Sequence, residues 1–164
     1  MSVIELASAA RLSAALADGP PALFAVLSRL FTAIPGIRTA TFIAVAPDRT
    51  VTHRIGTSKP EHFPVGNVDP VGDDVWNNTI LGQMRPLIGD SVAGMAAFLP
   101  ETDGLIAMGY GACSCFPIVI GGETRGVVAL LGDAGIFTTR VLAEIDALLP
   151  IAALIFTFHG ISER

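Results

Sequence analysis

Cys113 and Cys115 are the residues of this sequence best suited to chemistry, because thiolates act as nucleophiles, as redox groups and as ligands for soft metals. One residue separates them, so in a strand both thiols would lie on the same face. Their Cα atoms would then be roughly 6.5–7 Å apart, at the far limit of disulfide geometry. No basic residue adjoins either one in the sequence to lower the pKa of its thiol. We therefore expect both cysteines to be reduced, unbridged and packed as small apolar side chains.

Metal or haem chemistry would need further ligands. Cys113 and Cys115 could supply two soft ligands and His53 a third, but the sequence has no second cysteine pair and no His-rich spacing, so no metal site is predicted. Haem ligation by His53, His62 or His159 stays open, although a lone histidine is more often structural or exposed to solvent. No other cofactor is identified.

Bulky residues in the middle of the chain are the candidates for a ligand-binding wall. Trp76 and Tyr110 are the only residues of their kinds, and each couples a large apolar body to one polar group, which suits a small-molecule pocket. Ordinary core packing is the alternative for each member, because pockets and cores use the same residue types. The candidate ligand-binding residues are Trp76, Ile80, Met84, Met95, Phe98, Ile106, Met108 and Tyr110.

Charge and length exclude several classes of partner. The net charge is −5, Lys59 is the only lysine and the arginines are scattered, so no surface that follows nucleic-acid phosphates is expected. The start of the chain lacks the basic region and apolar run of a signal peptide. The most apolar stretch, residues 147–158, is interrupted by Pro150 and falls short of the about 20 residues that span a bilayer. We expect a cytoplasmic protein with neither nucleic acid nor membrane as partner.

Helices are expected at both ends of a single domain that spans residues 1–164. Ser2 and Glu5 form a capping-box pattern for a first helix that runs to about Leu16, and Pro20 begins a second helix. Together these helices occupy residues 1–36. A last helix, residues 138–159, is apolar on all sides in its second half and should kink at Pro150.

The region between these helices, residues 39–132, is expected to hold the sheet and a pocket segment. Two hairpins are predicted, because a turn signal joins two strand-like runs in each case, and the Gly121-Gly122 turn suits the second. Their strands are residues 39–46 with 50–55, and 112–120 with 123–131. Residues 56–72 are expected to be irregular and 100–104 to be a polar break. A short helix, a short strand and a further helix are expected at 74–81, 87–88 and 91–99.

The second hairpin resembles the GAF family in the run Cys115-Phe116-Pro117-Ile118-Val119-Ile120-Gly121-Gly122-Glu123-Thr124-Arg125-Gly126-Val127-Val128-Ala129-Leu130. Phe137 and Thr138, before the last helix, and the short strand that ends at Asp90 also resemble the family pattern. The resemblance implies an α+β fold with an antiparallel sheet of about six strands, with the terminal helices on one face. Short helices and loops on the other face would enclose a small-molecule pocket. Gly126 should let another element approach the sheet closely, and Pro117 should lie where no ladder hydrogen bond is needed.

The resemblance also implies functions. The leading hypothesis is a sensory or regulatory domain, not an enzyme, that binds a small molecule and signals through a partner protein or its own dimer interface. The alternative is a reductase of free methionine sulfoxide or a similar oxidised metabolite that uses Cys113 and Cys115. In those reductases, however, the cysteines precede the hairpin strand and acidic residues line the pocket, whereas here both cysteines lie in the strand and the partner strand 127–131 carries no carboxylate. A structural interaction module with a vestigial pocket is the third possibility.

A homodimer through the terminal helices is also expected. Residues 148–158 of the last helix carry no charge, and the sheet and the N-terminal helices can cover only part of its surface. A first helix that folds back over the last one within a single subunit is the competing interpretation.

Overall fold

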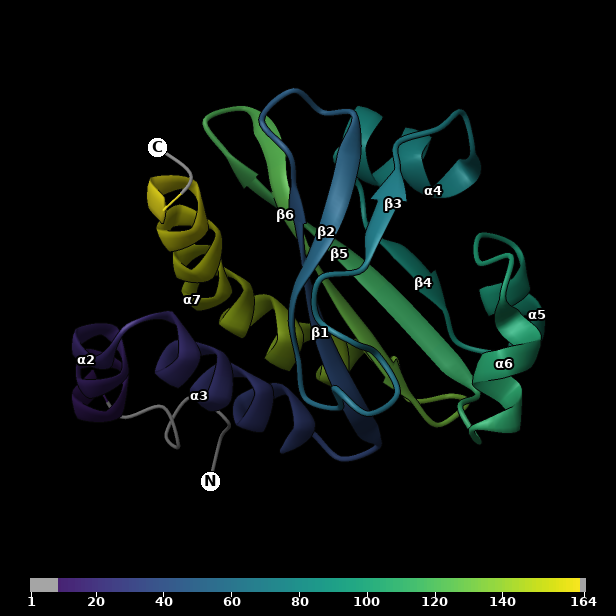
Figure 1. The fold of residues 1–164 in the computed structure, drawn as a ribbon. Helices are drawn as coiled ribbons and strands as arrows, with labels where there is room; N and C mark the ends of the chain where they lie inside the picture. The colour runs from purple at the N-terminus through teal and green to yellow at the C-terminus, as the bar shows by residue number, and fades with distance from the viewer. Residues whose placement is uncertain (1–8, 163–164) are drawn as a thin grey trace.

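Two long antiparallel hairpins form the centre of the sheet in the computed structural model, which describes residues 9–162 (Figure 1). The first hairpin joins β1 (Ile37–Val45) to β2 (Val51–Thr57), and the second joins β5 (Ala112–Ile120) to β6 (Glu123–Gly132). Strands β1 and β6 pair with each other, so the six strands have the order β3-β2-β1-β6-β5-β4 and every neighbouring pair is antiparallel. Both predicted hairpins are confirmed.

The edges of the sheet are short strands. Strand β4 (Leu87–Gly89) pairs with β5 only as far as Cys115, so Pro117 lies where the outer edge of β5 has no partner strand, as expected. Strand β3 (Val68–Pro70) pairs with β2 inside the segment 56–72, which therefore is not wholly irregular. All three residues of β3 are exposed, so the alternation that marks a half-buried strand is missing there.

The terminal helices cover one face of the sheet. Helix α3 (Pro20–Thr32) and helix α7 (Thr139–Ser162) pack on the strands and on each other, while α2 (Ala9–Asp18) packs mainly against α3 (Figure 1). The close approach predicted at Gly126 is confirmed, because a Cβ atom there would lie 2.1 Å from the Phe156 ring of α7. The predicted capping box at Ser2 and Glu5 lies outside the described residues.

Helix α7 is longer than the apolar stretch within it. It continues through Pro150, and its residues Thr139–His159, which contain an 18-residue window with a mean hydropathy of 2.0, are long and apolar enough to cross a membrane by length and composition alone. In this fold Ile145, Leu148 and Ile155 of α7 are buried in the core between helices and sheet. Of that 18-residue window 33% is buried within the domain, and helices that pack in a core also pass the same test of length and composition.

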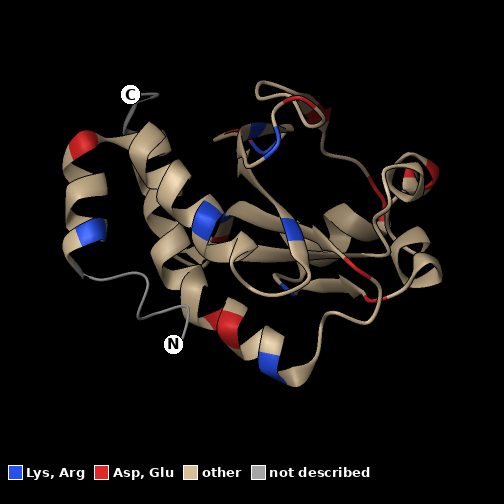
Figure 2. Cartoon of the chain, turned by 90° about the horizontal axis from the view of Figure 1, so that it is seen from below, with Lys and Arg blue, Asp and Glu red and all other residues tan. Residues whose placement is uncertain are grey.

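Short helices cover the opposite face. Helix α4 (Val75–Asn77) runs directly into the π-helix η1 (Asn78–Gly82), where one short helix was expected. Helix α5 (Val92–Ala96) follows β4. The polar break expected at 100–104 is only partly right, because helix α6 (Thr102–Ala107) begins within it. The fold is thus α+β, with terminal helices on one face and short helices on the other. Along the described part of the chain, Lys and Arg positions are spread over helices, strands and loops (Figure 2).

Candidate functional site

A second hydrophobic core separates the sheet from the short helices, and we call it the second core. Strand alternation assigns Cys113 and Cys115 of β5 and Val127 and Leu131 of β6 to this face, opposite the face that carries the terminal helices. Its buried residues are Ile80, Leu81, Met95, Phe98, Tyr110, Cys113, Cys115, Val127 and Leu131.

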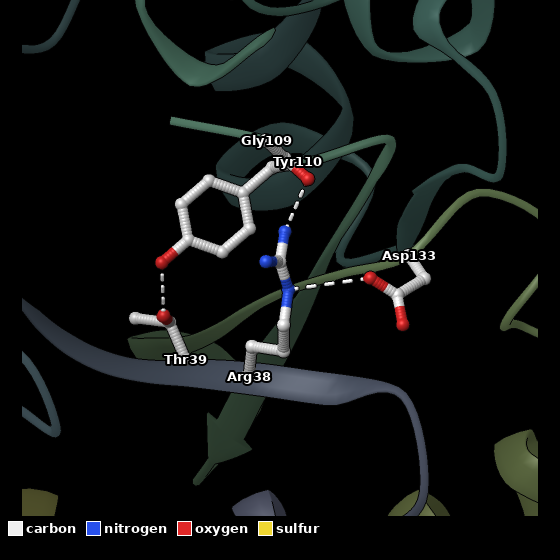
Figure 3. Close-up of polar contacts among 5 residues, drawn as sticks. All are labelled: Arg38, Thr39, Gly109, Tyr110 and Asp133. Atoms are coloured by element: carbon white, nitrogen blue, oxygen red, sulfur yellow. Dashed lines mark hydrogen bonds and ion pairs between the residues drawn. The ribbon is translucent and has the colours of Figure 1, made fainter. Parts of the chain in front are cut away.

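Tyr110 closes one end of the second core with a network of polar contacts (Figure 3). It is 4% exposed, and its hydroxyl lies 2.5 Å from Thr39 Oγ1 on β1. The guanidinium of Arg38 lies over the Tyr110 ring, 4.6 Å from its centroid, and donates a hydrogen bond to the carbonyl of Gly109. Arg38 Nε also lies 3.3 Å from a carboxylate oxygen of Asp133, in the connection between β6 and α7. The network therefore ties together β1, the start of β5 and the approach to α7.

Trp76 lies over the two cysteines. Its indole Nε1 donates to Cys115 Sγ at 3.4 Å, and both cysteines are free and buried. The hydrogen bond between the two thiols and burial raise the pKa of Cys113 well above its usual value. The hydrogen bond from Cys113 lowers the pKa of Cys115, with a further contribution from the Trp76 N–H, although burial acts against both. The two thiols hydrogen-bond to each other, Cys115 also accepts the Trp76 N–H, and neither cysteine offers an exposed thiolate.

Hydrogen bonds from the sheet hold the π-helix η1 in place. Thr124 Oγ1, fully buried on β6, donates to the carbonyl of Ile80 at 2.9 Å, and Arg49 donates to the carbonyls of Leu81 and Thr124, each at 3.3 Å. Asp74 accepts a hydrogen bond from the backbone N–H of Asn77 at 2.8 Å and so caps the preceding helix α4. These bonds position Ile80 and Trp76 against the strands.

The structure brings together five of the eight candidate ligand-binding residues: Trp76, Ile80, Met95, Phe98 and Tyr110. It places Met84, Ile106 and Met108 at the surface, where they are 41%, 39% and 39% exposed.

Sequence reasoning missed Arg38, Thr39 and Phe63, which contact Tyr110, and Asp133, which pairs with Arg38. Arg38 was only one of several scattered arginines, and its proximity to Tyr110 arises from strand pairing, which no local pattern reveals.

The histidines lie away from the cysteines. His53 and His159 line an open groove of about 410 Å³ between α3, β2 and α7, on the helix-covered side of the sheet, and His62 is exposed. His53 therefore does not meet Cys113 and Cys115. Within residues 9–162, no three His, Cys, Asp or Glu side chains are grouped as metal ligands would be.

Solved structures share this architecture over almost the whole chain. The GAF domain of a two-component sensor histidine kinase from Bacillus halodurans superimposes with a TM-score of 0.71 at 13% identity, covering 89% of this chain and 99% of that one. This chain has the GAF fold. A GAF domain/HD domain protein from Geobacter sulfurreducens matches with a TM-score of 0.66 at 16% identity, over 82% of this chain and 90% of the other. The chromophore-binding domain of a bacteriophytochrome from R. palustris matches with a TM-score of 0.65 at 10% identity, over 94% of this chain and 61% of the other. Neither protein-family models nor curated protein sequences give a match.

The residues that suggested a GAF domain have structural roles in this fold. Asp90, after β4, accepts a hydrogen bond from the backbone N–H of Phe137 at 3.0 Å. Thr138 accepts one from the N–H of Val141 at 3.3 Å and caps α7. The positive φ angles of Gly121 and Gly122, 65° and 83°, form the turn of the second hairpin.

Proposed function

We propose that this GAF domain is a sensory or regulatory module that binds a small, largely apolar molecule at the second core. The observation that carries the proposal is the second core itself. Its outer side is closed by short helices rather than by long ones, and Trp76 and Tyr110 contribute polar groups within it. Ligand sites are typically apolar with a few polar groups.

Movement of the short helices would be the response to the ligand. Each is only three to six residues long, so its own hydrogen bonds contribute little stability and its position depends on side-chain packing. The neighbouring fold from a sensor histidine kinase supports a signalling role. The signal would leave through a partner protein or the dimer interface.

Trp76 gives a direct test, because it is the only tryptophan and lies at the second core. Native mass spectrometry of the purified protein should reveal a carried small molecule, and its removal should change Trp76 fluorescence. A Trp76→Phe variant is the control for the fluorescence signal. A protein that carries no molecule and whose fluorescence responds to no compound in a metabolite library would instead favour a structural module.

The geometry does not support the reductase alternative. Cys113 and Cys115 are buried and free, hydrogen-bond to each other, and lie opposite Leu131 and Ala129 with no carboxylate partner; Cys115 also accepts the Trp76 N–H. Reduction of free methionine sulfoxide by the wild type that disappears in a Cys113→Ala/Cys115→Ala double variant would overturn this conclusion.

A further inference from the structure

We propose that the ligand is a small organic carboxylate with an apolar body, and that its carboxylate binds Arg38 while its apolar body packs against Tyr110. This inference rests on the proposed function and specifies the chemistry of the same site. Two groups of the protein itself, the Asp133 carboxylate and the Phe63 ring, occupy these positions in the structure.

Arg38 is held in place by contacts that leave its charge accessible. The Tyr110 ring supports the guanidinium from one side, and the Gly109 carbonyl accepts one of its N–H groups (Figure 3). Its side chain is still 37% exposed. A planar guanidinium fixed in this way is suited to a bidentate bond with a carboxylate, because little side-chain freedom remains to be lost on binding.

The Asp133 carboxylate is a replaceable partner for Arg38. Its side chain is 64% exposed, and it meets Arg38 at one atom only, the buried Nε at 3.3 Å, without hydrogen-bond geometry, so the ion pair is a weak single-point contact. Exposed pairs of this kind contribute little to stability, so an incoming carboxylate that uses two guanidinium N–H groups would compete well.

The Phe63 ring is a replaceable partner for Tyr110. The two ring centroids lie 6.2 Å apart. Phe63 is the only residue between 60 and 70 that is not exposed, so a single side chain anchors this stretch to the second core. Displacing that ring would open the Tyr110 face to a ligand and would also end its contact with the Arg54 guanidinium of β2, which lies 5.8 Å from the Phe63 ring centroid.

Tyr110 links the two replaceable contacts, because its ring meets both Arg38 and Phe63. Arg38 and Phe63 each touch the Tyr110 ring, whose hydroxyl is already bonded to Thr39. A molecule that replaced both the Asp133 carboxylate and the Phe63 ring would thus carry an acidic group and an apolar body. The same exchange would release Asp133, which precedes α7, and so would act on the helix that covers the other face.

Calorimetric titration with phenylacetate and isovalerate, each compared with its uncharged amide, tests the assignment. We expect the acids to bind the wild type and the amides to bind at least about tenfold more weakly, the scale of one charge-assisted bond. Asp133→Asn and Phe63→Ala should each tighten acid binding severalfold, whereas Asp146→Asn and Val65→Ala, at exposed positions elsewhere, should not. Arg38→Gln should abolish the preference for acid over amide, and Arg140→Gln should keep it.

In the titrations, any of three results would overturn the assignment: equal binding of acid and amide, no acid binding to the Asp133→Asn/Phe63→Ala double variant, or unchanged acid preference in Arg38→Gln. Circular dichroism of each variant establishes that it is folded. The proposed function is judged separately, by the carried molecule. If Arg38→Gln still carries that molecule and Trp76 still responds to its removal, the carboxylate assignment fails while the sensory function stands.

Discussion

Single side chains at the second core combine apolar burial with one specific polar contact. The Tyr110 and Thr39 hydroxyls share a hydrogen bond, Trp76 donates one to Cys115, and Thr124 donates one to the carbonyl of Ile80. Each contact satisfies a polar group that would otherwise be buried without a partner, which is costly in an apolar environment. These pairings fix which residues of the short helices face the sheet.

The cysteines should behave as core residues in solution. Because both thiols are buried and the pKa of Cys113 is raised, we expect native protein at neutral pH to react with iodoacetamide about a hundredfold more slowly than denatured protein. Trp76→Ala should accelerate labelling of Cys115 by removing the ring that covers it, and Trp76→Phe should do so much less. Mass spectrometry after timed quenching measures both rates. Rapid labelling of the native wild type would contradict the buried geometry.

At the scale of elements, the sequence indicated the structure wherever periodicity or turn chemistry was strong. The hairpins, α3 and α7 follow from alternation, from the helical stripe and from the Gly121-Gly122 turn. Strand β3 and helix α6 were missed because exposed or mixed residues form them, and contacts with β2 and α5 help to position them. The site was half predictable for the same reason. Residue type identified Trp76 and Tyr110, whereas Arg38 and Asp133 meet only through strand order.

The packing of α7 against β6 depends on Gly126 having no side chain. A methyl group there would overlap the Phe156 ring, so Gly126→Ala should lower the free energy of unfolding by about 1–3 kcal/mol, the usual range for overpacking. Urea denaturation followed by circular dichroism measures the change. Gly104→Ala is the matched control, because nothing lies within 4 Å of its added Cβ and its φ is not positive.

A double variant separates steric overlap from other effects of the same substitution. Phe156→Ala alone costs stability by leaving a cavity, but it also removes the atoms that Gly126→Ala would strike. The two changes together should therefore cost less than the sum of each alone. Additive losses would show that the Gly126–Phe156 contact is not the cause.

At the scale of the whole molecule, the two faces of the sheet have different structural roles. The terminal helices and the strands bury one continuous core, while the short helices close a separate one. Connections at the end of the sheet join the two, because Asp90 and Arg38 both bond the segment that leads into α7. A change at the second core thus has a physical route to α7, the element that the dimer hypothesis places at the interface.

The structure sharpens the dimer prediction by showing which side of α7 is outermost. Between residues 139 and 159 its large apolar side chains are buried or half-buried, and the exposed positions are small or polar, among them Ala143, Asp146, Pro150 and Thr157. The half-buried residues Leu149, Ile151, Leu154 and Phe158 border this surface. In its described part, Ala9–Asp18, helix α2 packs mainly against α3.

We therefore expect a two-fold symmetric dimer in which α7 surfaces meet through small residues, with the bordering apolar side chains becoming fully buried. Completing their burial must offset an association cost of about 4–15 kcal/mol, which predicts a dimer that dissociates at micromolar concentrations. Sedimentation equilibrium across that range measures it. Thr157→Glu would bring two negative charges together across the symmetric contact and should weaken dimerisation at least about tenfold, equivalent to about 1.4 kcal/mol. Thr50→Glu, on the exposed turn between β1 and β2, should leave the dimer unchanged. A wild-type monomer at every concentration, or equal effects of the two substitutions, would exclude this interface.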